Sequence, residues 1–175
     1  MQNIEFKAEL REIGFARAAL RRLGAHKVGR IEQVDTYFRV LTGRLKRRVA
    51  ITDGEPEPAE VIQYDRRDRP QPKMSRFTIY TEDEARERFG ELPLPIWCEV
   101  RKKREVWMWG GVRVHLDEVE DLGRFIEFEA LVTPRQHVRR CHELIAELRR
   151  ALGPAVGEPI STGYADMLAG GTRVG

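Results

Sequence analysis

The chain has 175 residues, 41% of them hydrophobic and 34% charged, with 31 basic against 28 acidic side chains. This length fits one domain, residues 1–175, with a hydrophobic core, and a net charge of +3 gives no reason to expect a nucleic-acid-binding protein. We find no signal-peptide pattern, no apolar run of membrane-spanning length and no metal or disulfide spacing of the two cysteines, so a cytoplasmic protein without membrane partners is expected.

The first half of the chain is dominated by strand patterns, in which apolar and polar side chains alternate. These patterns occupy residues 3–10, 31–40, 44–51, 60–66 and 74–80. A helix is predicted from about Glu12 to Leu23, ending at Gly24. Thr42-Gly43 is typical of a hairpin turn, and residues 53–58 are predicted to form a loop.

The second half adds two helices and three strands. Thr81 and Glu84 have the spacing of a capping box, which predicts a short helix ending at Gly90. Thr133, followed by Pro134 and Gln136, predicts the start of a helix that runs to about Leu152. Strands are expected over residues 97–109, 112–119 and 124–132. About eight strands joined mostly by hairpins, with three helices, indicate an antiparallel α+β protein.

Two neighbouring predicted strands carry an ionisable face opposite an apolar one. Arg113, His115 and Asp117 alternate with apolar residues, and so do Glu127 and Glu129. An antiparallel sheet often has one solvated face, which would explain the pattern without a site. A sheet that closes into a barrel, with helices outside, would instead turn this face into a lumen. Periodicity alone leaves both interpretations open.

A closed barrel would gather an excess of cations around a few carboxylates. The predicted lumen set is Lys7, Arg39, Lys46, Arg48, Arg66, Lys102, Arg104 and Arg113, against Glu5, Asp117, Glu127 and Glu129. Excess cations favour a polyanion, and bidentate arginines favour phosphate. Clustered carboxylates suit Mg²⁺ or Mn²⁺, and Glu127 and Glu129, about 6.6 Å apart on one face, would hold one or two ions. Phosphoryl or nucleotidyl transfer is therefore expected.

Motifs spread along the chain resemble the CYTH superfamily, which includes class IV adenylate cyclases and thiamine triphosphatases. They are NIEFK, QVDTYFRV, GRLKRR, the Tyr64–Arg66 pair, KKRE, RVHLDEVEDLG, FIEFE and the terminal SxxYADML. The resemblance implies a triphosphate tunnel inside a closed eight-stranded antiparallel β-barrel. The family's first-strand signature is ExExK, and this chain has Asn3 where the first glutamate is expected, which removes one negative charge from the implied metal site.

The resemblance also implies roles at the matched positions. Metal binding is implied for Glu5, Asp117, Glu127 and Glu129, and triphosphate binding for Lys7, Lys46, Arg48, Arg66, Lys102, Arg104 and Arg113, with Arg39 on the same predicted face. Glu5, Lys7 and Asp117 are the expected catalytic residues. Charged residues occupy both faces of 97–105, and the resemblance turns Lys102 and Arg104 inward.

The implied activity is that of a class IV adenylate cyclase, converting ATP to cyclic AMP and pyrophosphate with Mg²⁺ or Mn²⁺. The alternatives are a triphosphatase acting on inorganic or thiamine triphosphate, and a protein that binds a phosphorylated ligand without turnover. His115 is expected to position groups rather than act as a base, and Tyr164 and the Trp107–Trp109 pair to pack. Arg47 and the apolar outer sheet surface would allow a homodimer.

Overall fold

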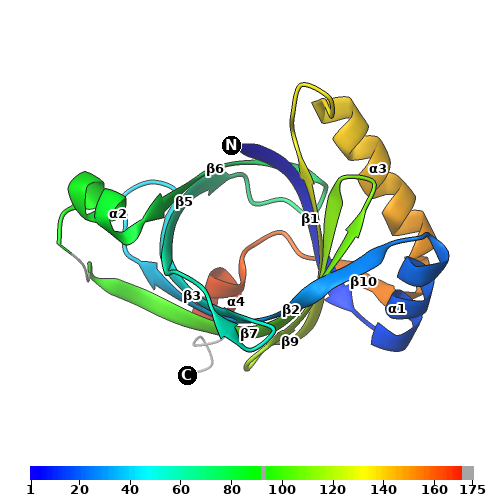
Figure 1. Ribbon diagram of the computed structural model, residues 1–175, viewed down its shortest axis with the longest axis horizontal. Coiled ribbons are helices and arrows are strands. Elements are labelled where there is room, and N and C mark those ends of the chain that lie inside the picture. The colour runs from blue at the N-terminus through cyan, green and yellow to red at the C-terminus, as the bar shows by residue number, and fades with distance from the viewer. Residues whose placement is uncertain (92–93, 171–175) are drawn as a thin grey trace.

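The computed structural model describes residues 1–91 and 94–170, and its centre is a closed barrel (Figure 1). Around the barrel the order is β1 (Gln2–Leu10), β6 (Lys73–Thr81), β5 (Glu60–Arg66), β3 (Arg44–Thr52), β2 (His26–Phe38), β7 (Ile96–Trp109), β8 (Val112–Val119) and β9 (Gly123–Leu131). Every neighbouring pair is antiparallel, and pairing of β9 with β1 closes the sheet. The predicted eight-stranded antiparallel barrel is confirmed.

Two short strands extend this sheet beyond the barrel. β4 (Glu55–Pro56) pairs with the end of β3, inside the segment predicted to be a loop. β10 (Val156–Pro159) pairs with the end of β1, on the same edge that β6 occupies nearer the start of β1. Both are too short to show the alternation by which strands are found in a sequence.

Helices α1 (Ile13–Arg22) and α3 (Val138–Ala151) cover one outer side of the barrel, and α2 (Glu82–Phe89) lies on the opposite side (Figure 1). The largest core cluster joins α1 and α3 to the outward-facing residues of β1, β8 and β9, including Phe6 and Phe128, and to Trp107 of β7. The alternation in these strands therefore points the apolar residues outward to the helices, which leaves the charged residues to the interior.

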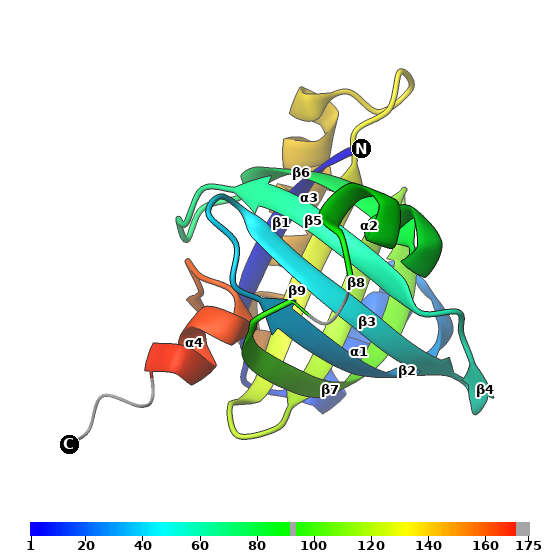
Figure 2. The same cartoon turned by 90° about the vertical axis from the view of Figure 1, so that its left-hand side faces the viewer.

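The last helix was not predicted as an element of its own. Helix α4 (Tyr164–Gly170), preceded in the chain by a 3₁₀ turn at Gly153–Ala155 and β10, lies across one end of the barrel (Figure 2). Its residues Tyr164 and Ala165 are buried against Tyr37, Val100 and Phe125. None of the helices in residues 1–91 and 94–170 is long and apolar enough to span a membrane.

The predicted start of α3 is wrong by several residues. Thr133 and Gln136 exchange both backbone hydrogen bonds, and the Thr133 hydroxyl accepts a third from the Gln136 N–H at 3.0 Å. Pro134 therefore lies within a tight turn and not in the first turn of a helix. The actual cap is His137, whose Nδ1 accepts from the Arg140 N–H. A capping pattern also fits a turn, because both use a side-chain oxygen to bind a backbone N–H two or three residues on.

Substitutions should cost the most stability in the apolar layer between the barrel and helices α1 and α3. Ile126 is fully buried in this layer, whereas Ile51 lies on the outer sheet surface with 40% of its area exposed. Ile126→Ala should lower the free energy of unfolding by about 2 to 5 kcal/mol, because the cavity it leaves is closed on all sides. Ile51→Ala, the matched control, should cost under about 1 kcal/mol. Urea unfolding of both variants checks this, and equal losses would contradict it.

Candidate functional site

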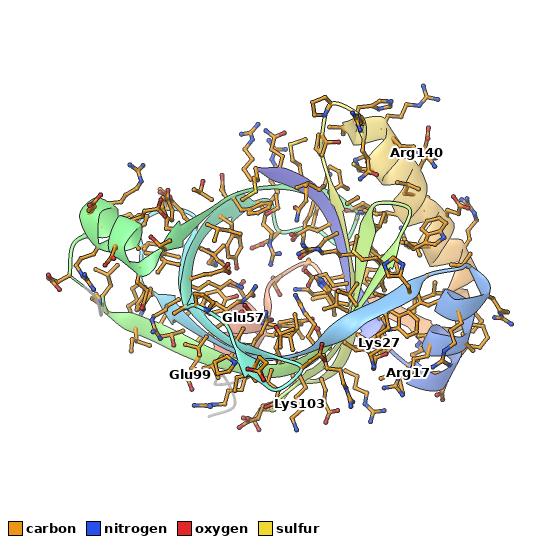
Figure 3. The ribbon with its side chains drawn as sticks, viewed as in Figure 1. Arg17, Lys27, Glu57, Glu99, Lys103 and Arg140 are labelled. Carbon is orange, nitrogen blue, oxygen red and sulfur yellow. The ribbon has the colours of Figure 1, made fainter. Side chains whose placement is uncertain are left out.

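The barrel encloses a cavity of about 500 Å³, lined by residues from all eight barrel strands and by Gly163 and Tyr164. This volume lies within the range of small-molecule sites. Seven cationic side chains and four carboxylates face the cavity. Figure 3 shows many side chains projecting into the barrel opening, while the labelled Glu99 and Lys103 of β7 point away from it. The charged face thus lines an interior.

The two ends of the cavity differ in chemistry. The β4 end is formed by the starts of β1, β2, β5 and β8, and Figure 2 shows it opposite α4. Apolar side chains gather toward this end: Val28, Ile31, Ile79, Val106 and Met108. The α4 end carries the aromatic residues Tyr37, Tyr64 and Tyr164. Arg113 lies beside Met108 at the β4 end, and most of the other charged groups lie between the two ends.

Three cations share one carboxylate on the β2–β3–β7 side of the lumen, and we call this set the Asp35 cluster. Asp35 accepts hydrogen bonds from Lys46 at 2.8 Å, from Lys102 at 2.7 Å and from Arg48 through two nitrogens at 2.7 and 3.0 Å. Asp35 is fully buried, and Lys46 and Lys102 are nearly so. One carboxylate compensates one cation, so the cluster retains excess positive charge that suits a polyanion.

Burial sets the protonation of this cluster. Burial alone would raise the pKa of Asp35, but Lys102, Lys46 and Arg48 together hold it well below its usual range. Burial lowers the pKa of Lys102 to about 8, against the opposing attraction of Asp35. Burial, with repulsion from Arg48, also holds the pKa of Lys46 well below its usual value. Both lysines therefore become easier to deprotonate, and an incoming anion would reverse this.

A second cluster, formed by His115, Glu127 and Glu129, lies on β8 and β9 and is called the acidic cluster here. One ligand atom from each of the three residues lies within 4.8 Å of the others. Burial, followed by the neighbouring Glu127, raises the pKa of Glu129 well above its usual range. Burial would also raise the pKa of Glu127, but Lys7, 3.0 Å away, holds it low. Burial and Arg104 lower the pKa of His115 to about 4.

The donor set of the acidic cluster fits a divalent cation. Carboxylate oxygens are the ligands that Mg²⁺ and Mn²⁺ prefer, and two adjacent carboxylates in a buried position repel each other unless a cation or a proton lies between them. The Asn3 amide oxygen, also buried and facing the lumen, has no hydrogen-bond partner among the described residues. The residues present therefore fit the metal that the sequence led us to expect.

Two other predicted carboxylates are held by arginines. Asp117 accepts two hydrogen bonds from Arg104 and one from the Tyr164 hydroxyl, all at 2.7 Å, and lies behind Arg104, outside the cavity lining. The structure does not group Asp117 with the acidic cluster. Glu5 faces the lumen, is paired in register with Glu129 and accepts a hydrogen bond from Arg66.

Most of the predicted lumen residues are brought together. Lys7, Lys46, Arg48, Arg66, Lys102, Arg104 and Arg113 all line the cavity with Glu5, Glu127 and Glu129. The predicted position of Arg39 in the lumen is wrong: the side chain is exposed and lies outside the cavity beside Trp97 and Glu99. The reason is local, because the pairing of β2 with β7 shifts register after Tyr37 and the strand ends at Phe38.

Sequence reasoning missed two groups. Asp35 falls on the predicted charged face, and its alternation with Val34 and Thr36 was the available signal. Lys73 gives no such signal. It is buried, donates to the Ser161 carbonyl at 2.6 Å and to the Arg69 carbonyl at 3.0 Å, and so ties the segment before α4 to the barrel.

The comparisons with known proteins agree with this geometry. The profile described as the CYTH domain matches residues 1–164. The PH1012 protein from Pyrococcus horikoshii OT3 is 21% identical, with a TM-score of 0.70 over 94% of this chain and 98% of that one. A candidate adenylate cyclase from Vibrio parahaemolyticus is 17% identical, with a TM-score of 0.67 over 95% and 97% of the two chains.

A third solved structure adds a different activity. A candidate adenylyl cyclase from Hippeastrum, described as having a dominant triphosphatase activity, is 13% identical, with a TM-score of 0.63 over 97% of this chain and 96% of that one. No curated protein matches the sequence. Identities this low show a shared fold.

Replacing Asp35 with the isosteric asparagine should destabilise the protein, because the substitution removes charge from the Asp35 cluster without changing the size of the side chain. In Asp35→Asn three cations lose their counter-charge, so the free energy of unfolding should fall by about 3 to 5 kcal/mol at neutral pH. Asp65→Asn, on the exposed side of β5, is the matched control and should change stability by less than about 0.5 kcal/mol. Denaturant unfolding of both variants measures this, and a stable Asp35→Asn protein would show that the lumen tolerates the uncompensated cations.

Proposed function

The chain belongs to the CYTH domain family, and from this premise we propose that it is a divalent-metal-dependent enzyme that cyclises ATP to cyclic AMP and pyrophosphate. The substrate triphosphate would lie in the barrel lumen. Support comes from the excess of cations over carboxylates there, from the acidic cluster and from the apolar β4 end. We propose Mg²⁺ or Mn²⁺ as the cofactor.

The observation that carries the cyclase assignment is the order of groups along the barrel. Met108 and Val28 lie at the β4 end, the acidic cluster is next to them on the adjoining strands, and the Asp35 cluster lies toward the α4 end. A nucleoside bound at the apolar end would place its α-phosphate beside the acidic cluster and its β- and γ-phosphates beside Lys46, Arg48 and Lys102. The α-phosphorus is the atom attacked in cyclisation.

The proposed reaction is an in-line displacement. The ribose 3′ oxygen forms a bond to the α-phosphorus, and the bond from that phosphorus to the bridging oxygen breaks, which releases pyrophosphate. The negative charge that develops on the pyrophosphate is stabilised by the cations of the Asp35 cluster. The 3′ hydroxyl proton passes to Glu5, through the Oε2 atom that Arg66 does not hold. A divalent ion held by Glu127 and Glu129 would supply charge neutralisation at the α-phosphate when bound.

The remaining lumen cations orient the substrate. Arg104 is fixed by its two hydrogen bonds to Asp117, which itself is held by Tyr164, so the guanidinium has little freedom to move. Lys7 lies between Glu127 and the Tyr164 ring, 3.9 Å from the ring centroid. We propose that Asp117 acts by positioning Arg104, and that Arg66 and Arg113 complete the phosphate-binding surface.

A triphosphatase is the second candidate, and the α4 end favours it. Tyr37, Tyr64 and Tyr164 offer aromatic contacts there, with Trp97 packed edge-on to Tyr37. A substrate whose organic group binds at this end would lie in the lumen in the opposite orientation. Its γ-phosphate would then lie beside the acidic cluster, where water would be the attacking group. The dominant triphosphatase activity of the Hippeastrum relative is consistent with such an orientation in this fold.

Product analysis separates the candidates. Purified protein is incubated with ATP, thiamine triphosphate or inorganic triphosphate and with Mg²⁺ or Mn²⁺. We expect cyclic AMP and pyrophosphate from ATP, and loss of at least about 100-fold in rate for Glu129→Gln. Glu118→Gln, exposed on the outside of β8, is the control and should keep full activity. Orthophosphate from any substrate would instead establish the triphosphatase, and binding without turnover would establish a non-catalytic protein.

The lowered pKa of Lys102 predicts a pH-dependent affinity for inorganic triphosphate, measured by calorimetry with a chelator present to remove metal. A bound polyanion favours the protonated amine, so affinity should be highest below pH 8 and fall as the pH rises past 8, where the free protein loses the proton. Lys102→Met should bind more weakly at pH 7 and show a shallower decline above pH 8. Lys46 acts in the same direction and accounts for the remaining slope.

Lys103 supplies the matched control for this experiment. It is adjacent in sequence, but its side chain points away from the lumen (Figure 3). Lys103→Met should therefore bind triphosphate as the unchanged protein does at each pH. A profile for Lys102→Met that coincides with that of Lys103→Met would remove Lys102 from the binding surface.

A further inference from the structure

We infer that His115 is a nitrogen ligand of the metal site, and that it makes the site selective for Mn²⁺ over Mg²⁺. The inference deepens the proposed function and rests on it only in that the acidic cluster holds a divalent cation. The carboxylates alone would describe a site for either ion. The histidine is what distinguishes them.

The His115 imidazole is buried beside the carboxylates of Glu127 and Glu129. His115 is only 3% exposed, and its Nδ1 lies 3.9 Å from the Glu127 Oε1 atom. That distance is too long for a hydrogen bond, yet it is short enough for a metal to bind both atoms at about 2.1 Å. A Glu129 oxygen completes a set of three donors within 4.8 Å.

A further observation is an unsatisfied atom. Among the described residues, His115 Nδ1 is one of three buried side-chain polar atoms without a hydrogen-bond partner. Another is the Asn3 amide oxygen, which also lines the lumen. A buried polar atom left unpaired is destabilising, so such atoms generally have a partner such as an ion or a water. A cation among the three donors would satisfy His115.

The neighbours of Glu127 leave the needed oxygen available. Lys7 and Arg104 both approach the Oε2 atom, at 3.0 and 3.7 Å, whereas Oε1 is the atom nearest the imidazole. The two oxygens of one carboxylate are thus divided between the cations of the lumen and the acidic cluster. Register fixes this division, because β9 pairs Glu127 with Lys7 on one side and with His115 on the other.

The alternative is a histidine that only fills space between strands. A packing histidine at this position would be expected to donate or accept at Nδ1, since both barrel neighbours and the lumen offer polar groups. Its ring also faces the cavity and not the apolar layer under α1 and α3. A structural role therefore leaves the unpaired nitrogen unexplained, whereas coordination explains it.

Ligand chemistry gives the selectivity. Mg²⁺ binds oxygen ligands almost exclusively and keeps several of its waters. Mn²⁺ also prefers oxygen but, as a first-row transition metal, accepts an imidazole nitrogen more readily than Mg²⁺ does. Two carboxylates and one imidazole form a mixed oxygen and nitrogen site. The chain thus favours Mn²⁺ at a position where carboxylates alone would leave the choice to the concentrations of the two ions.

The test uses pulsed electron paramagnetic resonance of Mn²⁺ bound to the unchanged, metal-stripped protein, without substrate. We expect modulation from a directly coordinated ¹⁴N nucleus, which a site of oxygen ligands lacks. The modulation should vanish in His115→Gln and persist in His142→Gln, a matched change on the outer helix α3. Calorimetry on the same proteins should show a loss of about tenfold or more in Mn²⁺ affinity for His115→Gln, with less than a threefold change for Mg²⁺.

Each outcome decides the matter. Mn²⁺ bound without nitrogen modulation, modulation that survives in His115→Gln, or no Mn²⁺ binding at all would overturn the inference. The spectrum of the unchanged protein suffices if His115→Gln does not fold. Cyclic AMP formation without nitrogen modulation would overturn the inference and leave the proposed function standing. Nitrogen modulation in a protein that forms no product would support the inference about His115 and overturn the proposed function.

Discussion

The closed barrel buries more positive than negative charge in its lumen, and both the fold and the site follow from how that charge is held. Asp35 neutralises one of the three cations that contact it, and all three are held in place by the strands that form the wall. Burying such a cluster is unfavourable on its own. It is tolerated because stability comes from another part of the same barrel, where α1 and α3 cover a continuous apolar layer on the outer face of β1, β8 and β9. The apolar packing of α1 and α3 outside the barrel thus offsets the cost of burying the charged groups in its lumen.

The same alternation then sets the order of chemistry along the lumen. Each strand presents every second residue to the interior, so a strand that contributes Lys7 near the α4 end contributes Glu5 and Asn3 farther along. Register between strands, and not proximity in sequence, decides which groups meet. Glu127 meets Lys7 and His115 because β9 lies between β1 and β8. The proposed orientation of the nucleotide follows from this order.

Alternation and hairpin turns were enough to predict an antiparallel sheet with one charged face, but the closure of that sheet into a barrel came from the family resemblance, because a solvated sheet face shows the same alternation. At 101–104 both faces of the strand are charged, so periodicity does not show which residues face the lumen. Only the family resemblance predicts that Lys102 and Arg104 face inward. Arg39 was misplaced because a register shift and a strand end are set by tertiary pairing with β7. The bonds of Asp117 to Arg104 and Tyr164 were equally out of reach, since α4 is a short helix whose position depends on the finished barrel.

Asn3 and His115 also bear on each other. The first removes a negative charge that the family signature would supply, and the second adds a donor that is neutral. Asn3 lowers the negative charge that the acidic cluster would otherwise present to an approaching phosphate, and His115 offers an atom that can bind a cation without restoring that charge. A site with fewer carboxylates holds Mg²⁺ less well, because that ion depends most on charged oxygens. The weaker signature and the proposed nitrogen ligand are therefore two parts of one arrangement, in which ligand type replaces charge as the means of holding the metal.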